Sequence, residues 1–126
     1  SGMREAQREQ FYLWLWENAP QIEEFHHGDC VGVDVEAAEL VAKLGIKIIC
    51  HPPIDESLRA FHKSDVVLPQ LTHFARNRAI VDSTDILIVI PWELSWQPKG
   101  GTWYTASYAK KIGNPFTIFY ETPGFH

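Results

Sequence analysis

The chain has 126 residues, 45% of them hydrophobic, and a formal net charge of −5 at pH 7. This size and balance are typical of one globular domain rather than a disordered segment, so we expect a single domain over residues 1–126. The acidic balance argues against nucleic-acid binding, and no apolar run reaches the length of a membrane span, which predicts a soluble, cytoplasmic protein with no membrane partner.

The apolar pattern predicts helices and strands in alternation. In chain order we expect a helix over residues 4–18, a strand over 24–27, a helix over 33–44, a strand over 46–50, a helix over 74–83, a strand over 85–90, a helix over 102–111 and a strand over 116–120. Residues 51–73 show little periodicity and are expected to form a long loop. This order predicts an α/β fold with three layers, in which a doubly wound, mainly parallel sheet is covered on both faces.

Two glycine turns mark the candidate site. The first glycine turn, residues 28–32, lies between a strand and a helix, and the second glycine turn, residues 99–102, precedes another helix. Glycine lets the backbone approach a ligand closely, and the first N–H groups of a helix are unpaired donors at the positive end of its dipole. The turns therefore indicate a phosphate-binding site at the carboxyl ends of parallel strands.

Side chains near the turns complete the predicted ligand-binding set. An arginine side chain can bind a phosphate bidentately, which favours this role for Arg76 and Arg78 over the alternative of a solvated pair at an exposed helix start. Asp29 is interpreted as a partner for sugar hydroxyls, and Asp34 as a residue that favours the helix dipole. The ligand-binding residues predicted from the sequence are Gly28, Asp29, Cys30, Gly32, Arg76, Arg78, Lys99, Gly100, Gly101 and Thr102.

The tryptophan residues allow further interpretations. Trp92, Trp96 and Trp103 crowd the second glycine turn, where they can stack a base or bury a self-association surface. The opening helix presents Trp14 and Trp16 on more than one side, which predicts a homo-oligomer.

The cysteines and histidines suggest no bound group. Cys30 and Cys50 suit small buried positions, so we expect reduced structural thiols. His26, His27, Asp29 and His51 invite a metal hypothesis, but adjacent histidines on a strand point to opposite faces and lack the paired spacing of zinc sites. We therefore expect no metal and no cofactor.

Three of these motifs resemble a known family. Residues 27–38 resemble the glycine turn and helix of the DNA-processing protein A group. Residues 76–82, the strand through Pro91 and Gly100-Gly101-Thr102 resemble the Arg-containing helix, strand and PGGxGTxxE turn of the Lonely Guy phosphoribohydrolases. Both groups belong to the SLOG superfamily of Rossmann-like nucleotide-binding domains, and the resemblance, which covers about residues 25–120, is greatest to its small single-domain members.

The chain departs from the family pattern in two places. The family has a first strand ahead of the opening helix, in the middle of the sheet, and this chain begins after it, so the strand is lost, cleaved away or replaced, for example by another chain. Unpaired backbone groups would then need other partners. In addition, Thr105 stands where the Lonely Guy turn carries its glutamate.

These observations predict binding of a nucleotide or ribose phosphate. The alternative is a hydrolase that cleaves the N-glycosidic bond of a nucleoside monophosphate, in which Asp29, Glu93 or Glu121 would replace the missing glutamate. Its catalytic residues are left open. A second alternative, single-stranded DNA binding, is disfavoured by the net charge of −5.

Overall fold

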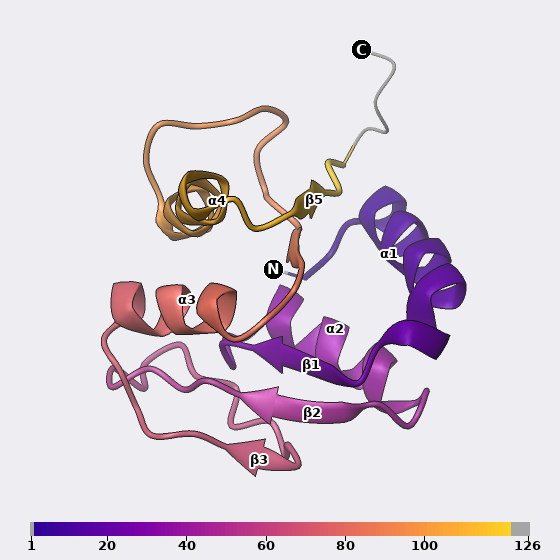
Figure 1. The fold of residues 1–126 in the computed structure, drawn as a ribbon, viewed down its shortest axis with the longest axis horizontal. Coiled ribbons are helices and arrows are strands. Elements are labelled where there is room, and N and C mark those ends of the chain that lie inside the picture. The colour runs from indigo at the N-terminus through magenta and orange to yellow at the C-terminus, as the bar shows by residue number, and fades with distance from the viewer. Residues whose placement is uncertain (1, 122–126) are drawn as a thin grey trace.

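The computed structural model describes residues 2–121, which form an α/β chain (Figure 1). The predicted alternation is confirmed, with one short strand, β3, that the sequence pattern did not predict. In chain order the elements are α1 (Glu5–Asn18), the 3-10 turn η1 (Ala19–Gln21), β1 (Glu24–His27), α2 (Val33–Ala42), β2 (Lys47–Cys50), β3 (Val66–Val67), α3 (His73–Asp82), β4 (Leu87–Val89), α4 (Gly101–Ile112) and β5 (Phe116–Ile118).

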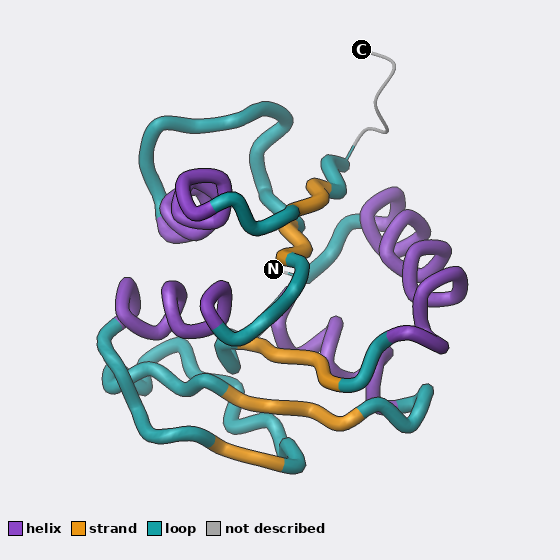
Figure 2. The backbone as a smooth tube through the Cα atoms, viewed as in Figure 1, coloured by secondary structure: helices purple, strands orange, loops and turns teal. Residues whose placement is uncertain are grey.

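The described strands form two separate parallel sheets. One has the order β1-β2-β3 and the other pairs β4 with β5 (Figure 2). The expected parallel pairing is therefore present, but β1 and β4 are not hydrogen-bonded to each other. Figure 1 shows α2 behind β1 and β2, whereas α3 lies nearer the viewer.

Helix α1 connects the two sheets. Phe11 and Leu15 are four residues apart, so they share one helix face, and both are buried against Val41 of α2 and Phe119, which follows β5. On the same helix the buried Gln7 amide donates hydrogen bonds to the carbonyl oxygens of Pro91 (2.6 Å) and Phe119 (2.9 Å). The helix thus packs on α2 and is tied to the chain just beyond β4 and β5.

Helix α4 has a second, smaller core. Trp103 and Ala106 of this helix are buried against Val89 of β4. The helix ends at Gly113, whose φ of 79° is the left-handed conformation that glycine adopts readily, as the sequence predicts. None of the helices in residues 2–121 has the length and apolar character needed to cross a bilayer.

Both cysteines are free thiols, as expected. Cys50 is buried at the end of β2, and this burial raises the pKa of its thiol to about 11. Cys30 is half-buried, and burial raises the pKa of its thiol as well. Neither group is activated as a thiolate at neutral pH.

Candidate functional site

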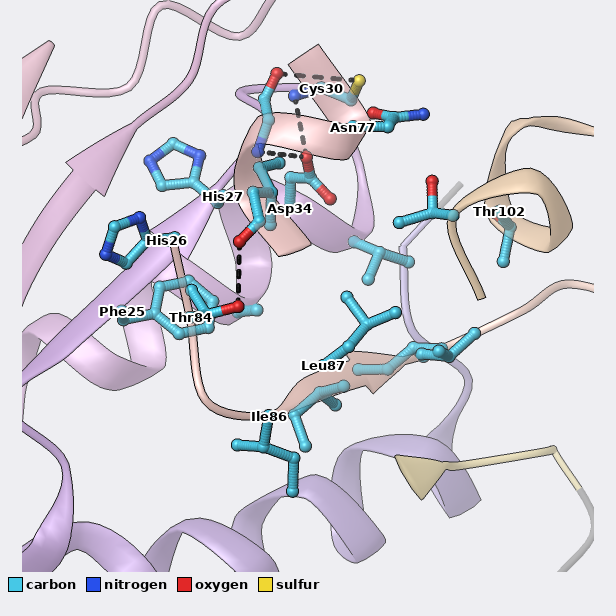
Figure 3. Close-up of a pocket in the computed structure, with 18 of the residues that line it drawn as sticks. Phe25, His26, His27, Cys30, Asp34, Asn77, Thr84, Ile86, Leu87 and Thr102 are labelled. Carbon is cyan, nitrogen blue, oxygen red and sulfur yellow. Dashed lines mark hydrogen bonds between the residues drawn. The ribbon is translucent and has the colours of Figure 1, made fainter. Parts of the chain in front are cut away.

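One cavity of about 1340 Å³ is lined by residues from both glycine turns. At one end, which we call the polar end, its walls come from the residues after β1, from the first turns of α3 and from the start of α4 (Figure 3). Asp34, Asn77 and Thr102 lie toward this end, away from Phe25 and Ile86. The residues of the polar end are Gly28, Cys30, Asp34, Arg76, Asn77, Gly101, Thr102 and Thr105.

The peptide groups of Gly28 are held from both sides. The Asp34 carboxylate accepts hydrogen bonds from the N–H groups of Gly28 (2.9 Å) and Cys30 (3.3 Å), and Arg76 Nη1 donates to the Gly28 carbonyl. A Cβ atom at position 28 would lie 2.6 Å from Arg76 Nη1 and 3.1 Å from Asp34 Oδ2. Glycine is therefore needed here because two charged side chains approach the backbone closely.

Asp34 does more than favour the dipole of α2. Desolvation of its carboxyl group raises the pKa of Asp34, while the N–H donors of Cys30 and Gly28 and the Arg76 guanidinium act in the opposite direction. Its carboxylate accepts hydrogen bonds from N–H groups of the first glycine turn, which the sequence predicted to be available to a ligand. A phosphate at this turn would therefore compete with a carboxylate of the protein.

Arg76 is buried at the polar end, with 4% of its surface exposed. Besides the Gly28 carbonyl, it donates to the carbonyl of His51 (3.3 Å) and to Asn77 Oδ1 (2.6 Å). Its Nη2 atom contacts two side chains, Cys30 Sγ at 3.9 Å and His73 Nδ1 at 3.2 Å. This side of the guanidinium is the one that an anion in the cavity could approach.

Arg78 lies away from the cavity. Its Nη1 atom donates to the hydroxyl of Tyr104 on α4 at 2.6 Å, and the residue is not part of the cavity wall. The two predicted arginines thus separate into a buried one at the candidate site and an exposed one between α3 and α4.

The second glycine turn provides the start of α4. Gly100 has a φ of 109° and is the N-cap, without a side-chain hydrogen bond to the helix in the described structure. Gly101 and Thr102 line the polar end, and a Cβ atom on Gly101 would lie 3.8 Å from Asn77 Nδ2. Lys99 and Gly100 line a neighbouring hollow of about 450 Å³ instead.

Asn77 lies at the polar end, although it was not among the ligand-binding residues predicted from the sequence. Its signal in the sequence was its position next to Arg76, which placed it in the same helical turn. Its place near the start of α4 depends on how α3 and α4 pack together, which no local pattern states.

Asp29 is turned away from the cavity and is fully buried. Its carboxylate accepts hydrogen bonds from Arg59 Nε (2.7 Å) and from the N–H groups of Phe61 (3.1 Å) and His62 (2.8 Å). Asp29 therefore anchors the long loop after β2. Gly32, the N-cap of α2 with a φ of 97°, is likewise not part of the cavity wall.

His27, Asp29 and Cys50 bring potential metal-ligand atoms within 4.8 Å of one another. The hydrogen bonds of Asp29 to Arg59 and the loop already occupy its carboxylate. His27 Nδ1 accepts from the N–H of Asp29 (3.0 Å), so the proton of the neutral ring lies on Nε2, which contacts Ser64 Oγ (3.0 Å). Protein groups account for these contacts without an ion.

The low pKa values of two buried histidines predict that the folded chain loses stability in mild acid. Burial lowers the pKa of His27 and of His51 from 6.5 to about 4. Below pH 6.5 the unfolded chain binds protons that the folded chain does not, so stability is full above pH 6.5 and falls toward pH 4, by up to about 3 kcal/mol for each histidine.

Urea unfolding from pH 7.5 to 4.5 tests this expectation. At each pH, the unfolding free energy of His51→Gln is subtracted from that of the wild type. The subtraction removes the contribution of Asp34, which has the opposite sign because the pKa of Asp34 is raised. The variant should show a shallower decline of unfolding free energy than the wild type. Equal slopes would show that His51 does not titrate differently in the two states.

The tryptophans near the second glycine turn have different environments. Trp103 is buried, and Trp96 packs against it with ring centroids 5.1 Å apart. Trp92 is 64% exposed and lies under the Arg4 guanidinium, 3.3 Å from the ring centroid. On α1, Trp16 is 73% exposed, and the self-association that it predicts stays a prediction.

The carboxylates considered as replacements for the family's glutamate do not line the cavity. Glu93 accepts a hydrogen bond from Trp103 Nε1 (3.1 Å), Glu121 pairs with Arg4 (3.4 Å), and Asp29 is held by Arg59. Thr105, at the glutamate position itself, donates to the carbonyl of Gly101 at 2.8 Å.

The chain was compared with protein-family models, curated proteins and solved structures. None of the three comparisons found a match.

Proposed function

We propose that this chain is a cytoplasmic nucleotide- or ribose-phosphate-binding domain with a Rossmann-like fold of the SLOG type. The observation that best supports this proposal is that residues of both glycine turns line one cavity, together with a buried arginine. Ligands of open parallel sheets bind beyond the carboxyl ends of the strands, which is where the polar end of this cavity lies.

The proposed phosphate position is between α4 and Arg76. The start of α4 offers N–H groups and the positive end of the helix dipole at Gly101 and Thr102. Arg76, which also lines the cavity, supplies a full positive charge, and its Nη2 atom would exchange its present partners Cys30 Sγ and His73 Nδ1 for the phosphate. Asn77 adds an amide for a sugar or base.

Binding is favoured over hydrolysis of an N-glycosidic bond. The polar end contains one carboxylate, that of Asp34, and its hydrogen bonds to Gly28 and Cys30 leave it poorly placed to activate water. Single-stranded DNA remains the least favoured ligand because the chain carries a net charge of −5. We also keep the prediction that the protein self-associates.

A negative charge at the start of α4 should block the ligand without harming the fold. In Thr102→Asp, the new carboxylate would sit at the positive end of the helix dipole, so the melting temperature should stay the same or rise slightly. The same carboxylate would repel a phosphate and occupy its N–H donors. We expect affinity to fall by about tenfold or more.

The measurement is isothermal titration with AMP, GMP, UMP and ribose 5-phosphate. Lys111→Gln is the matched control, because it makes the same change in net charge at the far end of α4 and should bind normally. Failure of all four compounds to bind to this chain would overturn the proposal.

A further inference from the structure

The hollow beside the second glycine turn adjoins the cavity. It has a volume of about 450 Å³, within the range of about 300–1,000 Å³ that is typical of small-molecule sites. Phe74 and Gly101 line both the hollow and the cavity, so the two spaces meet at these residues. The helices that carry them, α3 and α4, lie side by side (Figure 1). A ligand held at the polar end can therefore extend past Gly101 into the hollow.

Aromatic side chains form much of the wall of this hollow. Phe74, in the first turn of α3, packs against Tyr104, in the first turn of α4, with ring centroids 4.4 Å apart. Tyr104 and the buried Trp103 also line the hollow. Phe74 is 54% exposed, so part of its ring is left uncovered by the described chain. A planar ring in the hollow would bury this apolar surface and stack on it, and both effects are favourable.

The second glycine turn is divided between the two spaces. Gly101 and Thr102 line the polar end, whereas Lys99 and Gly100, which were also predicted to bind the ligand, line the hollow and not the cavity. The Lys99 ammonium brings a positive charge to the hollow next to the start of α4. A ligand that occupies both spaces would therefore meet the whole turn, and its anionic part would lie near this charge.

The parts of a nucleotide match these two adjoining spaces. In a nucleoside monophosphate, the ribose separates an anionic phosphate from a flat base. The phosphate position proposed above lies between Arg76 and the start of α4, and Gly101 borders both this position and the hollow. The hollow offers the base an aromatic platform, and stacking on such a ring suits every base because every base has a π-face. The aromatic lining thus favours a base over a second anionic group.

We propose that the hollow is the base-binding subsite of this chain, in which a purine ring stacks on Phe74 while the phosphate lies at the polar end. This inference rests on the nucleotide binding proposed above, and it narrows the ligand from a ribose phosphate to a purine nucleotide. A purine is favoured over a pyrimidine because two fused rings cover more of the exposed phenylalanine than one ring does. Phe74 therefore determines the preference for the base and leaves phosphate binding to Arg76 and α4.

The test compares AMP with ribose 5-phosphate, which carries a hydroxyl group in place of the base. In isothermal titration the wild type should bind AMP about tenfold more tightly than ribose 5-phosphate, with UMP between the two. In Phe74→Ala, the affinity for AMP should fall to that for ribose 5-phosphate, while the affinity for ribose 5-phosphate stays unchanged. Phe74→Trp keeps a flat ring at this position and should therefore keep the preference for AMP.

Tyr12→Ala is the matched control. Tyr12 is also 54% exposed on a helix, but it lines neither the cavity nor the hollow, so both affinities should equal those of the wild type. A second measurement needs no substitution at all. In the wild type with bound AMP, nuclear Overhauser contacts should join the H2 or H8 proton of adenine to the ring protons of Phe74. This result locates the base even if a variant at position 74 loses stability.

The possible failures of this inference and of the proposed function look different. If AMP and ribose 5-phosphate bind the wild type equally well, or if Phe74→Ala keeps the preference for AMP and Phe74 shows no contact with adenine, the base lies elsewhere and only the subsite is wrong. An equal loss of affinity for both compounds in Phe74→Ala would likewise contradict a role limited to the base. If neither compound binds the wild type, phosphate binding itself is refuted, and the base subsite with it.

Discussion

Replacing Arg76 with alanine should lower the free energy of unfolding by about 3–5 kcal/mol and abolish phosphate binding. The side chain is buried and holds the carbonyls of Gly28 and His51, so its removal leaves both without this donor and leaves the Asp34 carboxyl without a nearby positive charge. Arg76→Lys should lose less stability, because it keeps the charge, but it cannot reach all these acceptors. Urea unfolding and isothermal titration measure the two effects.

Arg78→Ala is the control for this prediction. It removes the same kind of side chain two residues along α3, where the guanidinium donates to the hydroxyl of Tyr104 and does not line the cavity. We expect stability close to the wild type. If Arg78→Ala weakened phosphate binding as much as Arg76→Ala, net charge rather than contact at the polar end would explain both results.

Replacing Asp29 with alanine should cost about 3–5 kcal/mol of unfolding free energy, because the Arg59 guanidinium would lose its buried partner. Asp29→Asn should also destabilise the chain, because both carboxylate oxygens accept hydrogen bonds, one from the N–H of His62 and the other from Arg59 and the N–H of Phe61, and an NH₂ group in place of either oxygen would face a donor. Urea unfolding measures the loss, and proteolysis should cut the loop after β2 faster in both variants.

Asp55→Asn is the matched control, in the loop that Asp29 anchors. Its carboxylate is exposed and accepts from the N–H of Ser57 (3.0 Å), so little change in stability is expected. Loss of phosphate binding by Asp29→Asn in a chain of unchanged stability would contradict the structural role and restore the prediction that Asp29 contacts the ligand.

Most helices and strands could be predicted from the sequence, because the residue patterns that indicate them lie within each element. The spacing of Phe11 and Leu15 places both on one face of α1, and Gly113 ends α4 in the left-handed conformation that glycine adopts readily. Residues 46–50 contain three β-branched isoleucines, and two of them lie in the strand β2, where they are buried. Strand β3 was missed because its two residues form a strand only by pairing with β2.

The site was predicted in outline, and its details depended on packing. The two glycine turns were found because glycine next to a helix start is visible in the sequence, and residues of both turns line one cavity. Which acidic residue faces that cavity was not visible: Asp29, with a φ of 59°, turns into the loop after β2, while Asp34 reaches back to Gly28. The direction of the Asp29 side chain depends on Arg59 and His62, which are 30 and 33 positions away in the chain.

By itself, the sequence determined the order and types of most elements, the glycine turns and the presence of cationic side chains near them, because periodicity and backbone freedom are properties of neighbouring residues. Only the tertiary structure decided that Arg76 rather than Arg78 lies at the cavity, that the strands form two separate sheets, and that α1 connects the sheets. These outcomes depend on contacts between segments far apart in the chain, which no local pattern encodes.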